Sequence, residues 1–281
     1  METPLSNYEI AKKLMAYTGK VAWPTITMFL ICFTLYIIFI VVGMLDIMPL
    51  WMVCIANTVL AYLLFTPLHE AGHKNISGKK GEYRMLEELI GWCSGLALMA
   101  PYPVVRYLHN EHHKHTNHPE KDPDYWVASQ NYFLLFLKCM TIYFDYVYQY
   151  FKKTKQLWTN RTHRLELIIS GLFIQSFNAS VILWGINQGW EYPILMVIIP
   201  GYVSLGLLAF AFDWLPHHPH AVQQKYLDTR IILKPGLSTI LVSQNMHLIH
   251  HLYAGIPFYH YGKALKVMKS TLKSKGAPIS E

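Results

Sequence analysis

Long uncharged apolar runs divide the chain into segments. Four stretches contain no Asp, Glu, Lys or Arg: residues 22–43, 47–68, 167–190 and 193–212. Each has about 20 residues or more, and a helix of that length crosses the hydrocarbon core of a bilayer. Because the bilayer interior offers no water to peptide groups, these runs are expected to be helices. Buried helices of a soluble core are the alternative, but four such runs exceed what one soluble core needs.

The connections between these runs are short, so the runs form two helical hairpins. "MLDI" joins the first two and "EY" joins the last two. Two further apolar segments, residues 89–105 and 131–151, lie between the hairpins; glycines and prolines interrupt the first, and Lys138 and Asp145 lie in the second. We expect both to be re-entrant or interfacial helices rather than spans. The pattern predicts an all-α integral membrane protein with four transmembrane helices, forming one domain over residues 1–281.

Positive charge occupies three parts of the chain. Of 24 Lys and Arg residues, three precede the first span, thirteen lie between residues 74 and 164, and eight follow residue 224, so neither hairpin tip carries any. By the positive-inside rule, both termini and the middle segment face the cytoplasm. This topology and the attraction to anionic headgroups account for the net charge of +7, which gives no indication of nucleic acid binding. The first run is long and lacks an A-x-A-like exit, so we expect an anchor rather than a cleaved signal peptide.

Histidines gather in four short segments. Thirteen of the 15 lie within residues 69–73, 109–118, 217–220 and 247–251, all on the predicted cytoplasmic side. "HEAGH" places two rings at i and i+4, while "HNEHH" and "HLIHH" each place three at i, i+3 and i+4. Such positions are neighbours on one helix face, so their rings can converge on a common ion. Eight nitrogen donors exceed the four that one tetrahedral zinc accepts, and the spacing therefore predicts two metal ions.

Two other functions are compatible with parts of this pattern. His69-Glu70-x-x-His73 matches the helix motif of zinc proteases, in which the glutamate is the general base, but one zinc leaves most of the clustered histidines unused. A histidine-rich membrane metal transporter or sensor is the second alternative. Its loops would be repetitive, whereas these histidines recur at helical spacing beside spans. Imidazole binds zinc, copper, iron and nickel alike, so the residues alone do not select the metal.

The order H-x3-H, H-x2-HH and H-x2-HH, with two spans inserted before the last box, resembles the membrane fatty acid desaturase superfamily. The similarity covers roughly residues 67–261. "HNEHHKHTNHPEKDPD", "NMHLIHHLYAGIPFYHY" and "FDWLPHHPH" are similar to segments of its carotenoid (beta-carotene) hydroxylase-like branch, whereas the generic box pattern favours a fatty acyl substrate. The resemblance implies a di-iron centre, with O2 as cosubstrate, held by nine ligands: His69, His73, His109, His112, His113, His217, His247, His250 and His251.

Acidic residues near these ligands are candidates for accepting hydrogen bonds from the ligand rings. They are Glu70, Asp122 and Asp124, although the last two also fit an Asp-Pro turn. Asp213 stands four residues before His217, where the family has Asn or Asp, and is expected to contact iron indirectly. No catalytic residue is expected beyond the metal ligands. The remaining histidines are not expected to be direct ligands: His115, His118, His163, His218, His220 and His260.

The resemblance implies an oxidoreductase of lipid metabolism that oxidises an unactivated C–H bond, by fatty acyl desaturation or by carotenoid ring hydroxylation. The spans and residues 131–151 are expected to supply an apolar channel for the lipid. The chain contains no His-Pro-Gly-Gly haem signature, no C-x4-C iron–sulfur loop and no G-x-G-x-x-G motif. A separate electron donor of the ferredoxin, rubredoxin or cytochrome type is therefore expected.

The substitution Glu70→Gln separates the protease from the di-iron enzyme. A zinc protease loses its general base and becomes inactive, because the amide cannot accept the proton from the attacking water. A di-iron enzyme is expected to retain part of its turnover, since Glu70 only supports a ligand. Turnover of the variant, measured against the wild-type chain, distinguishes these outcomes.

Overall fold

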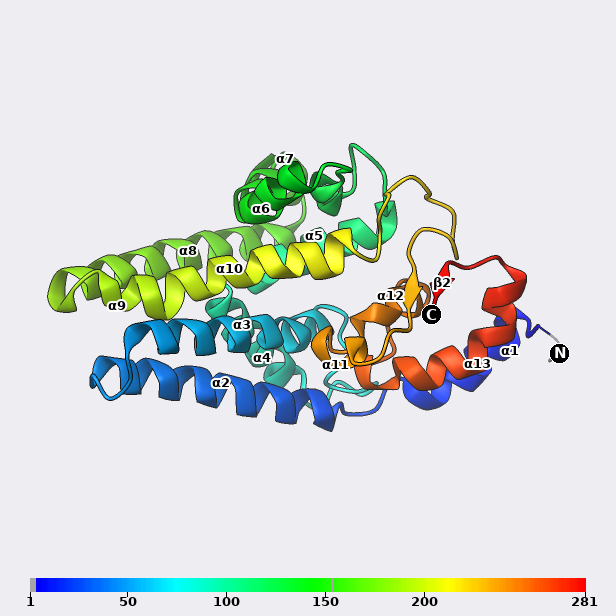
Figure 1. The fold of residues 1–281 in the computed structure, drawn as a ribbon, viewed down its shortest axis with the longest axis horizontal. Helices are drawn as coiled ribbons and strands as arrows, with labels where there is room; N and C mark the ends of the chain where they lie inside the picture. The colour runs from blue at the N-terminus through cyan, green and yellow to red at the C-terminus, as the bar shows by residue number, and fades with distance from the viewer. Residues whose placement is uncertain (1–3, 153) are drawn as a thin grey trace.

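The architecture is that of an all-α membrane protein. The computed structural model describes residues 4–152 and 154–281. Helices α2 (Trp23–Met44), α3 (Leu50–Gly72) and α8 (Arg161–Gln188), together with the helical run Glu191–Trp214, are each long and apolar enough to cross a membrane. Figure 1 shows these helices running along the long axis of the molecule. All four predicted spans are thus confirmed as helices, with ends shifted by one to six residues.

The last of these runs is built from four consecutive pieces. They are α9 (Glu191–Pro193), the π-helical η3 (Ile194–Ile198), α10 (Ile199–Leu208) and the π-helical η4 (Ala209–Trp214). Pro200 has no N–H for the helical ladder, which accounts for a break close to η3. The wide turns of η4 end the run beside the histidines of residues 217–220, and π-turns of this kind often occur at functional sites.

Helices α4 (Arg84–Ala97) and α5 (Tyr102–His115) form a bent pair with an angle of 95° between them. Close approach at the bend depends on glycine: a Cβ on Gly91 would lie 2.8 Å from the Tyr102 ring, and one on Gly95 would overlap the Ala100 carbonyl oxygen. Ala100 N–H donates to the Gly95 carbonyl and closes the turn (2.9 Å). The pair returns the chain to the end of the molecule where it began, as expected for a re-entrant segment.

The second predicted interfacial segment is the single helix α6 (Tyr132–Lys152), followed by α7 (Thr154–Trp158). It is not among the helices that meet the criteria for a span. Leu135, Cys139 and Ile142 pack towards the protein, while large aromatic side chains on the other face stay exposed. Exposed aromatic side chains of this kind are common where a helix meets the membrane interface, and the position of α6 in an interface stays a prediction from the sequence.

The 3-10 helix η2 (Pro123–Val127) packs against α6 and η4. The other elements form a cap at the end of the molecule opposite the α2–α3 connection (Figure 1). Ile10 and Leu14 of α1 pack against Tyr261, Met268 and Leu272 of α13, and all five side chains are almost fully buried. Strands β1 and β2 pair in parallel, Ile231 with Ile279. The cap elements are α1 (Asn7–Leu14), η1 (Met15–Tyr17), β1 (Ile231–Ile232), α11 (Leu237–Ile240), η5 (Gln244–Met246), α12 (His247–Leu252), η6 (Phe258–His260), α13 (Tyr261–Ser274) and β2 (Ile279–Ser280).

The bend between α4 and α5 is expected to be sensitive to one methyl group. Gly95→Ala places a Cβ against the backbone of Ala100, which cannot move without opening the turn. We expect a loss of stability of about 1–3 kcal/mol, typical of overpacking, measured as a lower midpoint in thermal unfolding of the purified protein. Gly171→Ala in α8 is the matched control, because its Cβ meets no atom within 4 Å. Equal midpoints for both variants would contradict this account of the bend.

Candidate metal centre

Five histidine rings from three helices converge in what we name the first cluster. His69 and His73 lie at the end of α3, His109 and His113 lie on α5, and His250 lies on α12. Ring nitrogens of His69, His73, His109 and His250 all lie within 4.8 Å of one another. His113 Nε2 lies between two of them, 3.0 Å from His109 Nε2 and 2.8 Å from His250 Nε2.

Four further rings form a second cluster next to the first. It consists of His112 from α5, His217 from the segment after η4, and His247 and His251 from α12, with ring nitrogens within 4.8 Å of one another. His112 Nε2 lies 3.2 Å from His251 Nε2. His217 is 3% exposed, and neither of its ring nitrogens has a hydrogen-bond partner among the described residues. The nine predicted ligand residues are therefore exactly the nine rings brought together in these two clusters.

Hydrogen bonding among the rings cannot account for the first cluster. The Nε2 atoms form a row, His73–His109–His113–His250–His69, with successive separations of 2.9, 3.0, 2.8 and 3.1 Å. Each ring nitrogen carries either one hydrogen or one lone pair, so it can take part in only one hydrogen bond within the ring plane. At most two of the four contacts can then be hydrogen bonds.

A cation removes this conflict, because neighbouring nitrogens can direct their lone pairs at it instead of at each other. Metal–imidazole bonds of about 2.0–2.1 Å at right angles separate two ligand nitrogens by about 3 Å, in line with the separations above. Both ring nitrogens of His217 are buried without a partner in the described part of the chain, and a cation in the second cluster would provide one. The donor set, made of neutral imidazoles with no thiolate, suits iron, copper, nickel or zinc. The residues present therefore fit the two metal ions that the resemblance implies.

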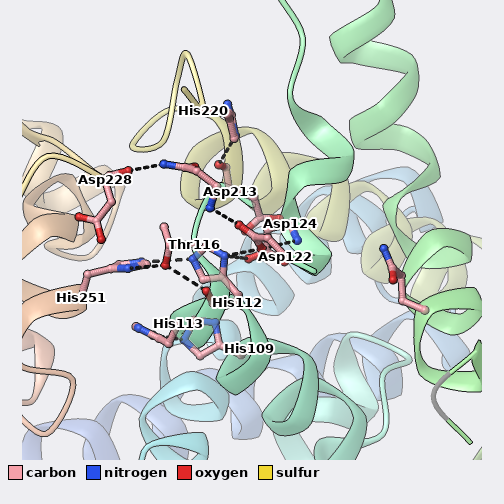
Figure 2. Close-up of polar contacts among 12 residues, drawn as sticks. His109, His112, His113, Thr116, Asp122, Asp124, Asp213, His220, Asp228 and His251 are labelled. Carbon is pink, nitrogen blue, oxygen red and sulfur yellow. Dashed lines mark hydrogen bonds and ion pairs between the residues drawn. The ribbon is translucent and has the colours of Figure 1, made fainter. Parts of the chain in front are cut away.

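The outer nitrogen of His112 is held by two carboxylates (Figure 2). His112 Nδ1 lies 2.8 Å from Asp122 Oδ1 and 3.2 Å from Asp124 Oδ2. Asp122 is itself fixed by the backbone N–H groups of Asn117 (2.6 Å) and Asp124 (2.9 Å). Carboxylates in this position orient a ligand ring and make it a stronger donor to a metal.

Neutral oxygens hold the outer nitrogens of other rings. His250 Nδ1 lies 3.0 Å from the Tyr261 hydroxyl, and His247 Nδ1 lies 3.2 Å from Gln244 Oε1. Thr116 Oγ1 lies 3.3 Å from His251 Nδ1 (Figure 2). With Nε2 directed into a cluster, Nδ1 of His247 carries the hydrogen and donates it to Gln244. These contacts fix the tautomer and the orientation of the rings.

Burial keeps most of the cluster rings outside α3 neutral. Removing a charged imidazolium from water is unfavourable, and neighbouring rings add repulsion. Both effects place the pKa well below the usual value of 6.5 for His109, His113, His217, His247, His250 and His251. His112 differs: burial lowers its pKa, but Asp122 and Asp124 together outweigh burial and raise its pKa to about 10. Neutral imidazole is the form that binds metal, so most of the site is ready to bind at neutral pH.

Two acidic residues lie less directly against the rings than Asp122 and Asp124. Glu70 is fully buried, its Oε1 is 3.9 Å from His69 Nδ1, and neither carboxylate oxygen has a hydrogen-bond partner among the described residues. Asp213 Oδ2 lies 3.4 Å from the Tyr146 hydroxyl, which also donates to Asp124 Oδ1 (2.6 Å). Asp213 is therefore connected to the second cluster through Tyr146 and Asp124.

Histidines that were not expected to be ligands lie outside both clusters. The His218 ring packs on Trp214, with centroids 4.6 Å apart, and His220 Nε2 lies 3.2 Å from the Asp213 carbonyl oxygen. His163 Nδ1 lies 3.3 Å from Glu166 Oε2. His260 is half-buried beside Tyr17 rather than on the open surface, with ring centroids 5.1 Å apart.

An apolar cavity of about 50 Å³ lies beside both clusters. The rings of His69 and His109 from the first cluster and of His112 and His247 from the second line it. Its other walls come from α3, α5, α6, α10 and η4. The apolar lining includes Phe65, Leu68, Leu108, Ile142, Leu205, Leu208 and Phe212.

Sequence reasoning missed the uncharged residues that hold the rings. Tyr146 belongs to no motif, and only its position in space reveals its contact. Thr116 and Tyr261 lie within the segments that resemble the family, but no role was assigned to them there. Gln244 stands three residues before His247, and this helical spacing was a signal for its contact.

The helical scaffold and its convergent histidines define a membrane protein equipped to bind metal. The family model described as fatty acid desaturase matches residues 45–281, and the chain belongs to this family. It is 24% identical over 250 residues to a fatty acid conjugase of Calendula officinalis, covering 75% of this chain and 66% of that protein. It is 24% identical over 240 residues to an sn-1 oleoyl-lipid 12-desaturase of Picosynechococcus sp., covering 72% and 63%. It is also 24% identical over 246 residues to a delta(12) fatty acid desaturase of Caenorhabditis elegans, covering 75% and 62%.

Removal of a cluster ring should deplete the protein of metal. In His250→Ala the first cluster loses the nitrogen that contacts both His69 and His113, so we expect at most half of the wild-type iron content and no turnover. Iron in the purified protein is measured by elemental analysis. His260→Ala is the matched control and should keep its iron and its activity, because its ring lies in neither cluster. Full iron content in His250→Ala would contradict the site.

Proposed function

We propose that this chain is a membrane di-iron oxidoreductase that uses O2 to oxidise an unactivated C–H bond of a fatty acyl lipid. The observation that carries the proposal is the convergence of nine imidazoles beside an apolar cavity, with ring nitrogens too close together to be satisfied by one another. The family of the chain supports the same chemistry.

Each cluster is proposed to hold one iron. The first iron is bound by His69, His73, His109, His113 and His250, and the second by His112, His217, His247 and His251. Two bound irons supply the reductive activation of O2 needed to remove hydrogen from a saturated carbon. Asp122 and Asp124 hold His112 in place, and Tyr261 does the same for His250.

The chain's own contribution to the reaction is positioning. The apolar walls of the cavity hold an acyl segment against the edges of the four ring ligands that line it, and they exclude water from the reacting carbon. Removal of two hydrogens from neighbouring carbons gives a double bond, and return of a hydroxyl gives an alcohol. The position of the acyl carbons relative to the rings selects between these outcomes.

An acyl lipid is the favoured substrate. The cavity is lined mainly by aliphatic and aromatic side chains, which suit a polymethylene chain. Relatives of the chain are named as acting on oleoyl lipids and fatty acids. Carotenoid ring hydroxylation, to which the second and third histidine boxes point, is the alternative that the experiment below tests.

Orientation and electron supply complete the proposal. Both termini and the clusters face the cytoplasm, the side on which all Lys and Arg residues lie in the predicted topology. Electrons come from a separate carrier. A relative from Nostoc sp. is named as an sn-1 acyl-lipid omega-3 desaturase that uses ferredoxin, which supports a carrier of the ferredoxin class over the rubredoxin and cytochrome alternatives.

Lipid profiling tests the function. The chain is expressed in a host that makes both acyl lipids and beta-carotene and supplies ferredoxin, and both lipid classes are analysed by mass spectrometry. We expect acyl chains two mass units lighter, with a new double bond, and unchanged carotenoids. His112→Ala is the matched inactive control. Hydroxylated carotenoids with constant acyl unsaturation would reject the acyl substrate, and loosely exchanging zinc in place of about two irons per chain would reject the di-iron enzyme.

A further inference from the structure

A second apolar groove lies within the membrane-spanning region, away from the metal clusters. It has a volume of about 400 Å³ and is bordered by α2, the end of α4, and α8. A neighbouring hollow of about 430 Å³ shares Ile40 and Trp184 with it, so the two form one continuous groove. None of the residues that line the metal-side cavity takes part, and no titratable Asp, Glu, Lys, Arg or His side chain lines the groove.

Two buried hydrogen-bond donors in this groove have no partner. Tyr36 is 4% exposed, and its hydroxyl is buried without a hydrogen bond to any described residue. Trp184 Nε1 on the opposite wall is likewise buried and unpartnered. A buried polar group without a partner costs several kcal/mol. An acceptor on a molecule in the groove would satisfy both donors.

Polarity changes along the groove as it does along a phospholipid. Phe33, Ile37, Phe173 and Phe177 line the part that reaches the end of α4. At the other end the hollow is bordered by Asn187 and Gln188, the last residues of α8. Trp184 lies one turn before them, at the depth where tryptophan is enriched in membrane proteins because an indole N–H can meet the interfacial polar groups.

The weak packing of α8 leaves room for such a molecule. Only 6% of its most apolar 18-residue window is buried inside the protein, compared with 28% for α2 and 39% for α3. Ser176 and Ser180 are the small residues that α8 presents to the groove. A bound molecule between α8 and α2 would contact both helices and fill the space between them.

We propose that this groove binds one glycerophospholipid of the leaflet opposite the metal clusters. Its acyl chain lies along the Phe33–Phe177 part of the groove, its ester carbonyls accept hydrogen bonds from Trp184 Nε1 and the Tyr36 hydroxyl, and its headgroup lies at Asn187 and Gln188. This lipid is bound as a structural component, holding α8 against α2. The site is separate from the substrate cavity and does not depend on the proposed reaction.

Lipid titration tests the groove. Purified, delipidated protein in detergent, without reductant, is titrated with dipalmitoylphosphatidylcholine, and bound lipid is counted by native mass spectrometry. Trp184→Phe keeps an aromatic ring and removes only the donor, so we expect the dissociation constant to rise about fivefold to tenfold, the effect of one hydrogen bond. Trp51→Phe is the matched control: Trp51 lies at the same end of the bundle, is 62% exposed on α3 and borders no part of the groove.

A second measurement guards against misfolded variants. Phosphatidylcholine with brominated acyl chains quenches nearby indoles, and at low lipid content we expect quenching of the wild-type and Trp51→Phe proteins but much less of Trp184→Phe. Iron content, measured on the same samples, should match the wild type in all three. Equal affinities for the two tryptophan variants would overturn the proposal, as would a lipid-free dimer in which a second chain occupies the groove. Neither result would bear on the metal clusters, since iron and turnover report on those separately.

Discussion

The crowding of neutral imidazole nitrogens is the constraint on which the remaining structure depends. Five nitrogens stand in a row at separations of 2.8–3.1 Å, and they cannot satisfy one another. Holding them so close requires that the ends of α3, α5 and α12 meet at one point. The sharp bend between α4 and α5 serves this requirement, because it brings α5 back to the end of α3. The cap serves it as well, since Tyr261 at the start of α13 fixes the His250 ring.

Predictions from the sequence succeeded where one strong physical rule governs the residues. Bilayer thickness sets the length of an uncharged run, so the four spans were predicted within a few residues. The largest error was at the start of α8, which begins at Arg161. Its first turns carry charges and therefore lie outside the uncharged run from which the span was predicted. Histidine spacing predicted eight of the nine converging rings, and the family resemblance added His217. The spacing did not predict how the rings are distributed between the two clusters. His112 and His113 are adjacent in the sequence, yet they point about 100° apart around α5 and belong to different clusters.

Other features depend on contacts between distant residues, which one sequence does not reveal. Asp213 was expected to contact the metal indirectly. In the structure it meets the hydroxyl of Tyr146, a residue that is 67 positions away and belongs to no motif. Asp122 and Asp124 both contact the ring of His112, a proposed ligand. The Asp-Pro turn, which was the competing explanation for these residues, is what presents both carboxylates to that ring. Here the turn and the ligand contact are one feature.

Helix α6 contributes both to the lining of the cavity and to the hydrogen bonds that hold His112. Ile142 and Tyr146 stand one turn apart on the same face and both line the cavity. Ile142 makes only apolar contacts, to the cavity and to its neighbours in the core, so another apolar side chain at this position would change the room for a lipid. Tyr146 also bonds the aspartate that holds His112, so loss of its hydroxyl would disturb the surroundings of a proposed metal ligand. New substrate preferences should therefore arise through changes at position 142, while Tyr146 is retained.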